Sequence, residues 1–88
     1  MSLQEKFDKA AEDVKKLKTT PSNDQLLELY GLFKQATVGD NTTAKPGLLD
    51  FKGKAKWEAW EGRKGTTKDS AMEQYVALAE KLIAEIGL

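Results

Sequence analysis

The stretch from Gly39 to Lys52, which reads GDNTTAKPGLLDFK, interrupts an otherwise helical sequence and constrains the fold more than any other feature. Glycine, asparagine and proline recur in it as turn and helix-breaking residues. About a dozen extended residues reach roughly 40 Å, whereas a helix of about sixteen residues is roughly 24 Å long. The loop is long enough to run back along a helix, so we expect the helices on its two sides to be parallel.

Apolar residues recur at spacings of three and four on both sides of this loop, which predicts helices. Ser2 with Glu5 and Ser22 with Gln25 have the spacing of capping boxes at the starts of two of them. A chain of 88 residues allows one modest core. We therefore expect a single domain over 1–88, an all-α four-helix bundle with a long crossover loop between its second and third helices. The expected helices span about 3–18, 23–38, 53–63 and 67–87.

Composition excludes several classes of function. The formal net charge is zero, from 14 basic and 14 acidic residues, which argues against a nucleic-acid partner. Neither cysteine nor histidine is present, so thiol and imidazole catalysis and thiolate metal sites are excluded. We expect no enzyme, no metal site and no cofactor. The N-terminus lacks the apolar run of a secretory signal, which favours a cytoplasmic location.

The second predicted helix carries a first candidate binding site. Tyr30, Phe33 and Lys34 lie within about one helical turn and share one side of it. A phenol, an aromatic face and an ammonium group suit a phosphorylated aromatic ligand. The alternative is that Tyr30 and Phe33 pack in the core and Lys34 is solvated, because apolar stripes usually serve packing. The spacing alone leaves both interpretations open.

A second candidate lies in the run FKGKAKWEAW, where lysines alternate beside two tryptophans. Lys52 and Lys56 share a helix face at a spacing of four, and like charges placed in this way repel unless an anion lies between them. Lysines are also common on solvated helix faces. The run is therefore weak evidence for an anion site when taken by itself.

Two runs in the middle of the chain, YGLFKQATVGD and KPGLLDFKGKAKWEAW, closely resemble the signature of the acyl-CoA-binding protein family, also called diazepam-binding inhibitor. FDKAAEDVKKLKTTP near the start and GTTKDSAMEQYV near the end also resemble that family. The motifs are long and ungapped, and together they cover nearly the whole chain.

The resemblance implies a four-helix bundle in up-down-down-up order, which agrees with the crossover expected from the loop length. It also implies a binding protein and not an enzyme. Members of the family bind long-chain fatty acyl-CoA esters such as palmitoyl-CoA with high affinity, acting as intracellular carriers and pool formers. The nucleotide is expected at the surface, with the acyl chain shielded in a groove of the bundle.

Matched by position, Tyr30, Lys34 and Lys56 correspond to the family's contacts with the 3′-phosphate of the ribose. Phe33 corresponds to the aromatic residue that stacks on adenine. Many members have tyrosine at this position, so the resemblance implies that stacking survives here while a hydrogen bond from the hydroxyl is lost.

Three further positions match ligand contacts of the family. Tyr75 matches a contacting tyrosine, and Lys15 matches a position near the nucleotide. Leu26 matches a position along the acyl chain, which would account for the wide apolar face of the second helix. Lys45 stands where the family often has arginine, a difference of little consequence.

The family reading implies a monomer whose further partners are acyl-CoA-using enzymes and, transiently, a membrane surface. A second hypothesis treats the chain as an interaction module whose apolar face on the second helix docks a partner helix. Such a partner would compete at Leu26 and Tyr30 without depending on phosphates. An enzyme acting on acyl-CoA is a third hypothesis. Which acyl length is preferred does not follow from the sequence.

Overall fold

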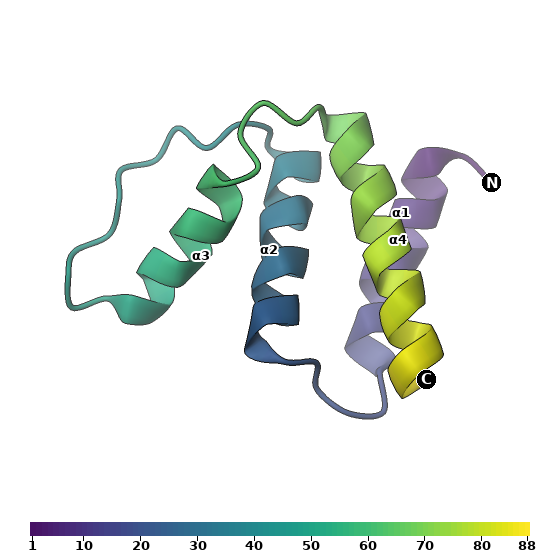
Figure 1. Ribbon diagram of the computed structural model, residues 1–88. Coiled ribbons are helices and arrows are strands. Elements are labelled where there is room, and N and C mark those ends of the chain that lie inside the picture. The colour runs from purple at the N-terminus through teal and green to yellow at the C-terminus, as the bar shows by residue number, and fades with distance from the viewer.

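The computed structural model describes all 88 residues and contains four α-helices and no strand. In Figure 1, α2 and α3 run in the same direction, and α1 and α4 run in the opposite one. The long loop between α2 and α3 returns along the bundle, so the predicted up-down-down-up order and crossover are confirmed. The helices are α1 (Leu3–Asp13), α2 (Asn23–Thr37), α3 (Phe51–Glu61) and α4 (Lys68–Ile86).

The starts of α1 and α2 follow from local capping. The hydroxyl of Ser2 accepts a hydrogen bond from the Glu5 backbone N–H, and the Glu5 carboxylate accepts one from the Ser2 N–H. Ser22 and Gln25 form the same reciprocal pair at α2. Each box satisfies two backbone donors that the first helical turn leaves free.

The first helix ends earlier than residue 18, where the apolar periodicity placed its end. The α-helix stops at Asp13 and tightens into the 3-10 turn η1 (Val14–Lys16), a common way for a helix to end. Leu17 then leaves helical geometry, and the Lys18 N–H donates to the Gly87 carbonyl oxygen at 2.9 Å. The chain pairs here with the C-terminal end of the protein instead of adding another turn.

The third helix begins at Phe51, two residues before the expected start at Gly53. Asp50 is its N-cap, because the carboxylate accepts a hydrogen bond from the Gly53 backbone N–H at 3.0 Å. An aspartate followed three residues later by glycine lacks the second half of a capping box, so the sequence pattern did not reveal this start.

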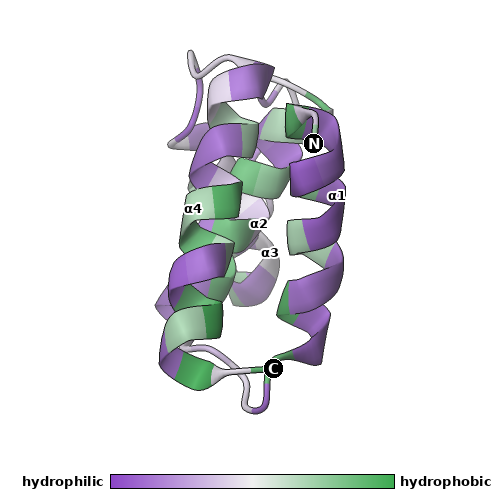
Figure 2. Ribbon diagram, turned by 90° about the vertical axis from the view of Figure 1, so that its right-hand side faces the viewer, coloured by the Kyte–Doolittle hydropathy of each residue, from purple (hydrophilic) through white to green (hydrophobic).

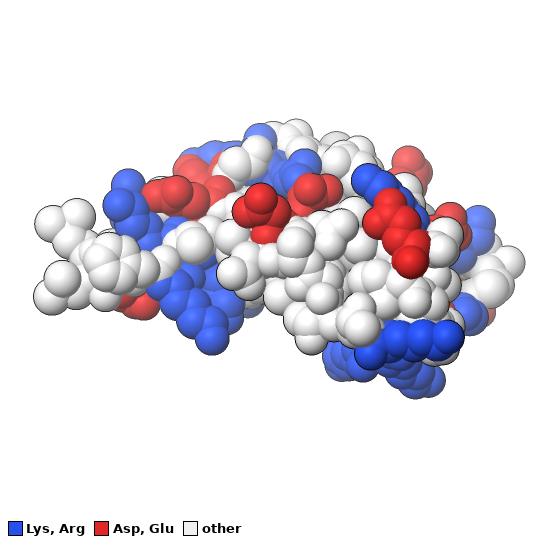
Figure 3. Space-filling model, turned by 60° about the horizontal axis from the view of Figure 1, so that its bottom comes forward, with Lys and Arg blue, Asp and Glu red and all other residues white.

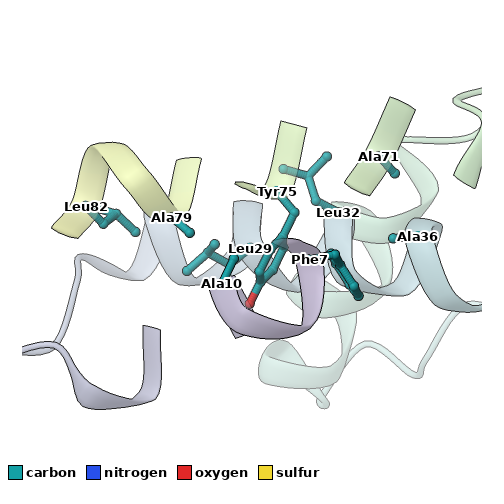
Figure 4. Packing of buried hydrophobic residues seen from close by; sticks show 9 residues of the cluster. All are labelled: Phe7, Ala10, Leu29, Leu32, Ala36, Ala71, Tyr75, Ala79 and Leu82. Carbon is teal, nitrogen blue, oxygen red and sulfur yellow. The ribbon is translucent and has the colours of Figure 1, made fainter. Parts of the chain in front are cut away.

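Helix α4 is central to the packing, because it contacts both α1 and α2, while α3 packs against α2 alone. In Figure 2, α1 and α4 turn their hydrophobic residues toward each other and their hydrophilic residues outward. Two fully buried alanines, Ala71 and Ala79, let the neighbouring helices approach α4 closely. Figure 4 shows the core cluster of Phe7, Ala10, Leu29, Leu32, Ala36, Ala71, Tyr75, Ala79 and Leu82.

Helices α2 and α3 meet at a glycine. A Cβ atom at Gly31 would overlap the backbone carbonyl oxygen of Ala59 on α3, so only glycine permits this close approach. Trp60, the one buried residue of α3, lies next to Ala59 in the same contact. The position of α3 therefore depends on a missing side chain in α2.

Two indoles anchor the crossover loop to α3. The Trp60 Nε1–H donates to the Gly39 carbonyl oxygen at 2.8 Å, and the Trp57 Nε1–H donates to that of Thr43 at 3.0 Å. The loop is thus attached to α3 at two points by donors that a buried or half-buried indole must satisfy. None of the helices is both long and apolar enough to cross a membrane.

A polar cluster joins the end of α2 to the turn before α4. One carboxylate oxygen of Asp40 accepts hydrogen bonds from the Gly65 backbone N–H at 2.9 Å and from the Gln35 amide at 2.8 Å. The same amide donates to the Thr66 carbonyl oxygen at 2.7 Å. The two hydrogen bonds to the Asp40 carboxylate hold its pKa below the ordinary value, and the bond from Gly65 has the larger effect.

Candidate functional site

A groove of about 690 Å³ lies between α1 and α2. Both helices pack against α4, but their backbones do not contact each other, so the space between them stays open above α4. Eight of its thirteen lining residues are hydrophobic. Its volume lies within the range of about 300–1,000 Å³ that small-molecule sites occupy.

The structure places five of the seven sequence-predicted site residues along this one groove, although they come from three separate segments of the chain. Lys15 belongs to η1, and α4 contributes a single residue. The five residues are Lys15, Leu26, Tyr30, Phe33 and Tyr75.

Three aromatic rings form the inner wall of the groove. Phe7 stacks on Phe33 with ring centroids 5.6 Å apart, and its edge meets Tyr75 at 5.0 Å. Phe33 is 39% exposed, so its ring remains accessible from the solvent side. The sequence indicated only a core role for Phe7, and the structure adds a position in the groove wall. Apolar periodicity predicts both roles equally and does not separate them.

Tyr75 reaches the groove from α4. It is buried, and in Figure 4 its hydroxyl oxygen points from α4 toward α1. Burial raises the pKa of the Tyr75 hydroxyl above its ordinary value, so the group stays protonated and able to donate a hydrogen bond at neutral pH. A protonated donor at the floor of an apolar groove can fix the orientation of a polar group on a ligand.

The remaining two predicted residues, Lys34 and Lys56, lie outside the groove lining. The Nζ of Lys56 lies over the Tyr30 ring, 5.5 Å from its centroid, so α3 brings this lysine to the residue that lines the groove. The Nζ of Lys34 lies over the Trp60 ring at 5.5 Å, on the side of α2 that faces α3. The structure therefore brings Lys56 to Tyr30 but directs Lys34 toward α3.

Leu26 lies on the exposed part of the groove. Its side chain is 40% exposed although leucine is usually buried. The wide apolar face predicted for α2 is thus divided, with Leu29 and Leu32 in the core and Leu26 open to solvent. An exposed leucine beside an apolar groove is suited to contact with an apolar ligand or partner.

The acidic side chains do not gather into a metal-binding cluster. No group of three or more acidic side chains is placed to hold a metal ion. A second depression, of about 540 Å³, lies between another face of α1 and α4. None of the seven predicted site residues lines it. The chemistry that the seven residues offer is therefore concentrated at the groove between α1 and α2 and at its α3 side.

Comparison with known proteins identifies sequence relatives over nearly the whole chain. A family model described as "Acyl CoA binding protein" matches residues 4–79. Acyl-CoA-binding protein homolog 1 of Caenorhabditis elegans is 67% identical over 81 residues, which cover 92% of this chain and 94% of the relative. The acyl-CoA-binding protein homolog of Drosophila melanogaster is 57% identical over 83 residues, covering 94% and 96%.

Solved structures of similar proteins share the fold. The crystal structure of Oryza sativa acyl-CoA-binding protein 2 matches with a TM-score of 0.91 at 45% identity, covering 96% of this chain and 93% of that one. The solution structure of the acyl coenzyme A binding protein from yeast matches with a TM-score of 0.74 at 50% identity, covering 93% and 95%.

Proposed function

Because this chain belongs to the acyl-CoA-binding protein family, we propose that it binds long-chain fatty acyl-CoA esters in the groove between α1 and α2. The observation that carries the proposal is the convergence of five predicted ligand residues, from three chain segments, on that groove. The acyl chain lies along the apolar walls beside Leu26, and the nucleotide lies at the aromatic and basic side near α3.

The phosphate site is proposed at Tyr30. The Lys56 ammonium already lies 5.5 Å from the centre of that ring, and Lys34 is one helical turn from Tyr30 on α2. A cation–π contact at an exposed site is worth about 0.5–1 kcal/mol, whereas a hydrogen bond to a charged group contributes about 1.5–3 kcal/mol. A bound 3′-phosphate therefore draws both lysines from their aromatic rings toward itself.

The adenine ring is proposed to stack on Phe33. The free face of this ring continues the stack that Phe7 begins, and every base offers a flat face to such a platform. Phenylalanine lacks the hydroxyl that a tyrosine would offer here, so stacking is its whole contribution. Tyr75 donates from the groove floor to a polar group of the ligand.

The acyl chain supplies the larger part of the binding free energy. Each buried methylene contributes about 0.8 kcal/mol, so ten of them outweigh two or three phosphate hydrogen bonds before the costs of association are subtracted. Affinity then rises with chain length until the groove is filled. The protein acts in this proposal as a monomeric cytoplasmic carrier, not an enzyme, that delivers acyl-CoA to the enzymes using it and to membrane surfaces.

Calorimetric titration with palmitoyl-CoA tests the proposal, with free CoA and palmitate as controls. We expect tight one-to-one binding of the ester and much weaker binding of either half. Absence of heat with all three ligands would contradict the proposal and favour the second hypothesis, in which the groove and Leu26 receive a partner helix. A thioesterase assay on the same samples tests the remaining hypothesis of an enzyme acting on acyl-CoA.

A further inference from the structure

The turn that leads into α3 exposes two leucines. The Asp50 N–H donates to the Gly47 carbonyl oxygen at 3.1 Å, which places Leu48 and Leu49 at the two central positions of a tight turn. They are 81% and 90% exposed, and Phe51, which follows Asp50, is 74% exposed. Turn tips usually carry glycine, proline or short polar residues. Here they carry the three most exposed large apolar side chains of the protein.

The apolar tip, as we call Leu48, Leu49 and Phe51, belongs to a basic segment of the chain, in which Lys45 alone forms an ion pair, with Glu58 at 3.9 Å. The segment 45–56 contains four lysines against a single acidic residue, Asp50, in a chain whose net charge is zero. The Asp50 carboxylate is engaged as the cap of α3. In Figure 3, uncharged side chains form the projecting left-hand end of the molecule, and Lys and Arg side chains lie beside it together with some Asp and Glu side chains.

The tip lies at the periphery of the fold. Helix α3 packs against α2 alone, and the molecule measures 37 × 27 × 14 Å along its principal axes. Figure 1 shows the turn before α3 at the outer corner of the crossover, away from α1 and α4. A large flat partner can therefore reach the three side chains without meeting the rest of the bundle first.

We propose that the apolar tip docks the protein on an anionic lipid surface. Leu48, Leu49 and Phe51 enter the boundary between headgroups and acyl chains, and the surrounding lysines face the anionic headgroups. A specific protein–protein interface usually buries more than about 1,000 Å², which a projecting tip of three side chains does not provide. Self-association through the tip would bring two lysine clusters together, which like-charge repulsion opposes.

Docking also bears on ligand exchange, and this consequence rests on the proposed function. Lys56 follows Phe51 by five residues, which is about 8 Å along a helix. A docked tip therefore brings the lysine beside Tyr30, and with it the basic side of the groove, close to the headgroup layer. An acyl-CoA whose nucleotide lies at the bilayer surface would meet the groove there.

Sedimentation with vesicles tests the docking in the absence of acyl-CoA. Vesicles of phosphatidylcholine are compared with vesicles in which about a third of the lipid is phosphatidylserine. We expect binding to the anionic vesicles that weakens as salt is added. The triple variant Leu48→Ser, Leu49→Ser, Phe51→Ser should reduce the partition coefficient by at least about tenfold.

The matched control is Val38→Ser, which replaces a 54% exposed apolar side chain away from the tip and should leave vesicle binding unchanged. Circular dichroism and palmitoyl-CoA titration of the triple variant check that the fold and the groove are intact.

Equal vesicle binding by wild type and the triple variant, or an equal loss in the Val38 control, would overturn the proposal. A tip-dependent dimer in sedimentation velocity without vesicle binding would also overturn it. If the wild-type protein does not bind palmitoyl-CoA, that result counts against the proposed function alone.

Discussion

Replacing Gly31 by alanine tests how α3 is held against the bundle. The new methyl group would overlap the Ala59 carbonyl oxygen, a main-chain atom inside α3 that has no rotamer by which to move away. Overpacking of this kind costs about 1–3 kcal/mol, and a rigid neighbour favours the upper half of that range. Alanine recovers about 1 kcal/mol in helix propensity relative to glycine. The steric effect is the larger one.

We therefore expect Gly31→Ala to lower the free energy of unfolding by roughly 1–2 kcal/mol. For a domain of this size, each kcal/mol shifts Tm by about 4–8 °C. Urea denaturation followed by tryptophan fluorescence is a suitable assay, because both tryptophans, Trp57 and Trp60, lie on α3. Gly47→Ala is the control, since a Cβ there has no atom within 4 Å and should change stability by less than about 0.5 kcal/mol.

The same substitution should weaken ligand binding in protein that is still folded. Lys56 reaches Tyr30 from α3, so moving α3 outward withdraws the ammonium from the proposed phosphate site. Loss of one hydrogen bond to a charged group corresponds to about tenfold or more in affinity. A Gly31→Ala variant as stable as the wild type, or more stable, would refute the close approach of the two helices. A destabilised variant with unchanged palmitoyl-CoA affinity would refute the link between α3 and the phosphate.

Three further predictions concern the groove and the loop. Lys56→Met should weaken palmitoyl-CoA binding by about tenfold or more in calorimetry. The control Lys54→Met, on the same helix, should have little effect on that affinity. Equal losses of affinity in the two variants would contradict the assigned phosphate contact. Phe33→Ala should weaken binding by about tenfold through lost stacking, while Phe33→Tyr should bind at least as well as the wild type. Asp40 has a pKa lowered in the folded state, so its stabilising contribution is complete above its unfolded pKa of about 3.9 and is lost as the pH falls through the folded value. The difference in unfolding free energy between wild type and Asp40→Asn should therefore be larger at neutral pH than near pH 3, and a constant difference would contradict this assignment.

Features that depend on neighbouring residues were predictable from the sequence. The capping boxes at Ser2 and Ser22 involve partners three residues away, so their spacing determines them. The parallel arrangement of α2 and α3 followed from the length of the crossover, because a loop that can span a helix removes the need for an antiparallel neighbour. Family resemblance supplied the choice of ligand residues, which the apolar spacing alone had left undecided.

Features that depend on contacts between distant segments were not predictable in this way. Nothing in the sequence near Gly31 indicates that a carbonyl oxygen 28 residues later, on Ala59, will occupy the space of its missing side chain. The bond from Gly65 to Asp40 spans 25 residues. The sequence likewise placed Lys34 with Tyr30 because both lie on one helix, whereas packing of α3 draws its ammonium over Trp60. Each of these contacts is decided by which helices meet.

The position of α3 explains why the least buried helix carries the charged part of the proposed site. Its only buried residue is Trp60, which lies outside the core cluster, and its contacts are with α2 and the crossover loop. A helix held in this way contributes little to the core and has a low cost of local displacement. A phosphate bound between Lys56 on α3 and Tyr30 on α2 would bridge the two helices and oppose that displacement. Ligand binding and the attachment of α3 are then coupled, which places the most adjustable part of the protein at the point where a charged ligand enters and leaves.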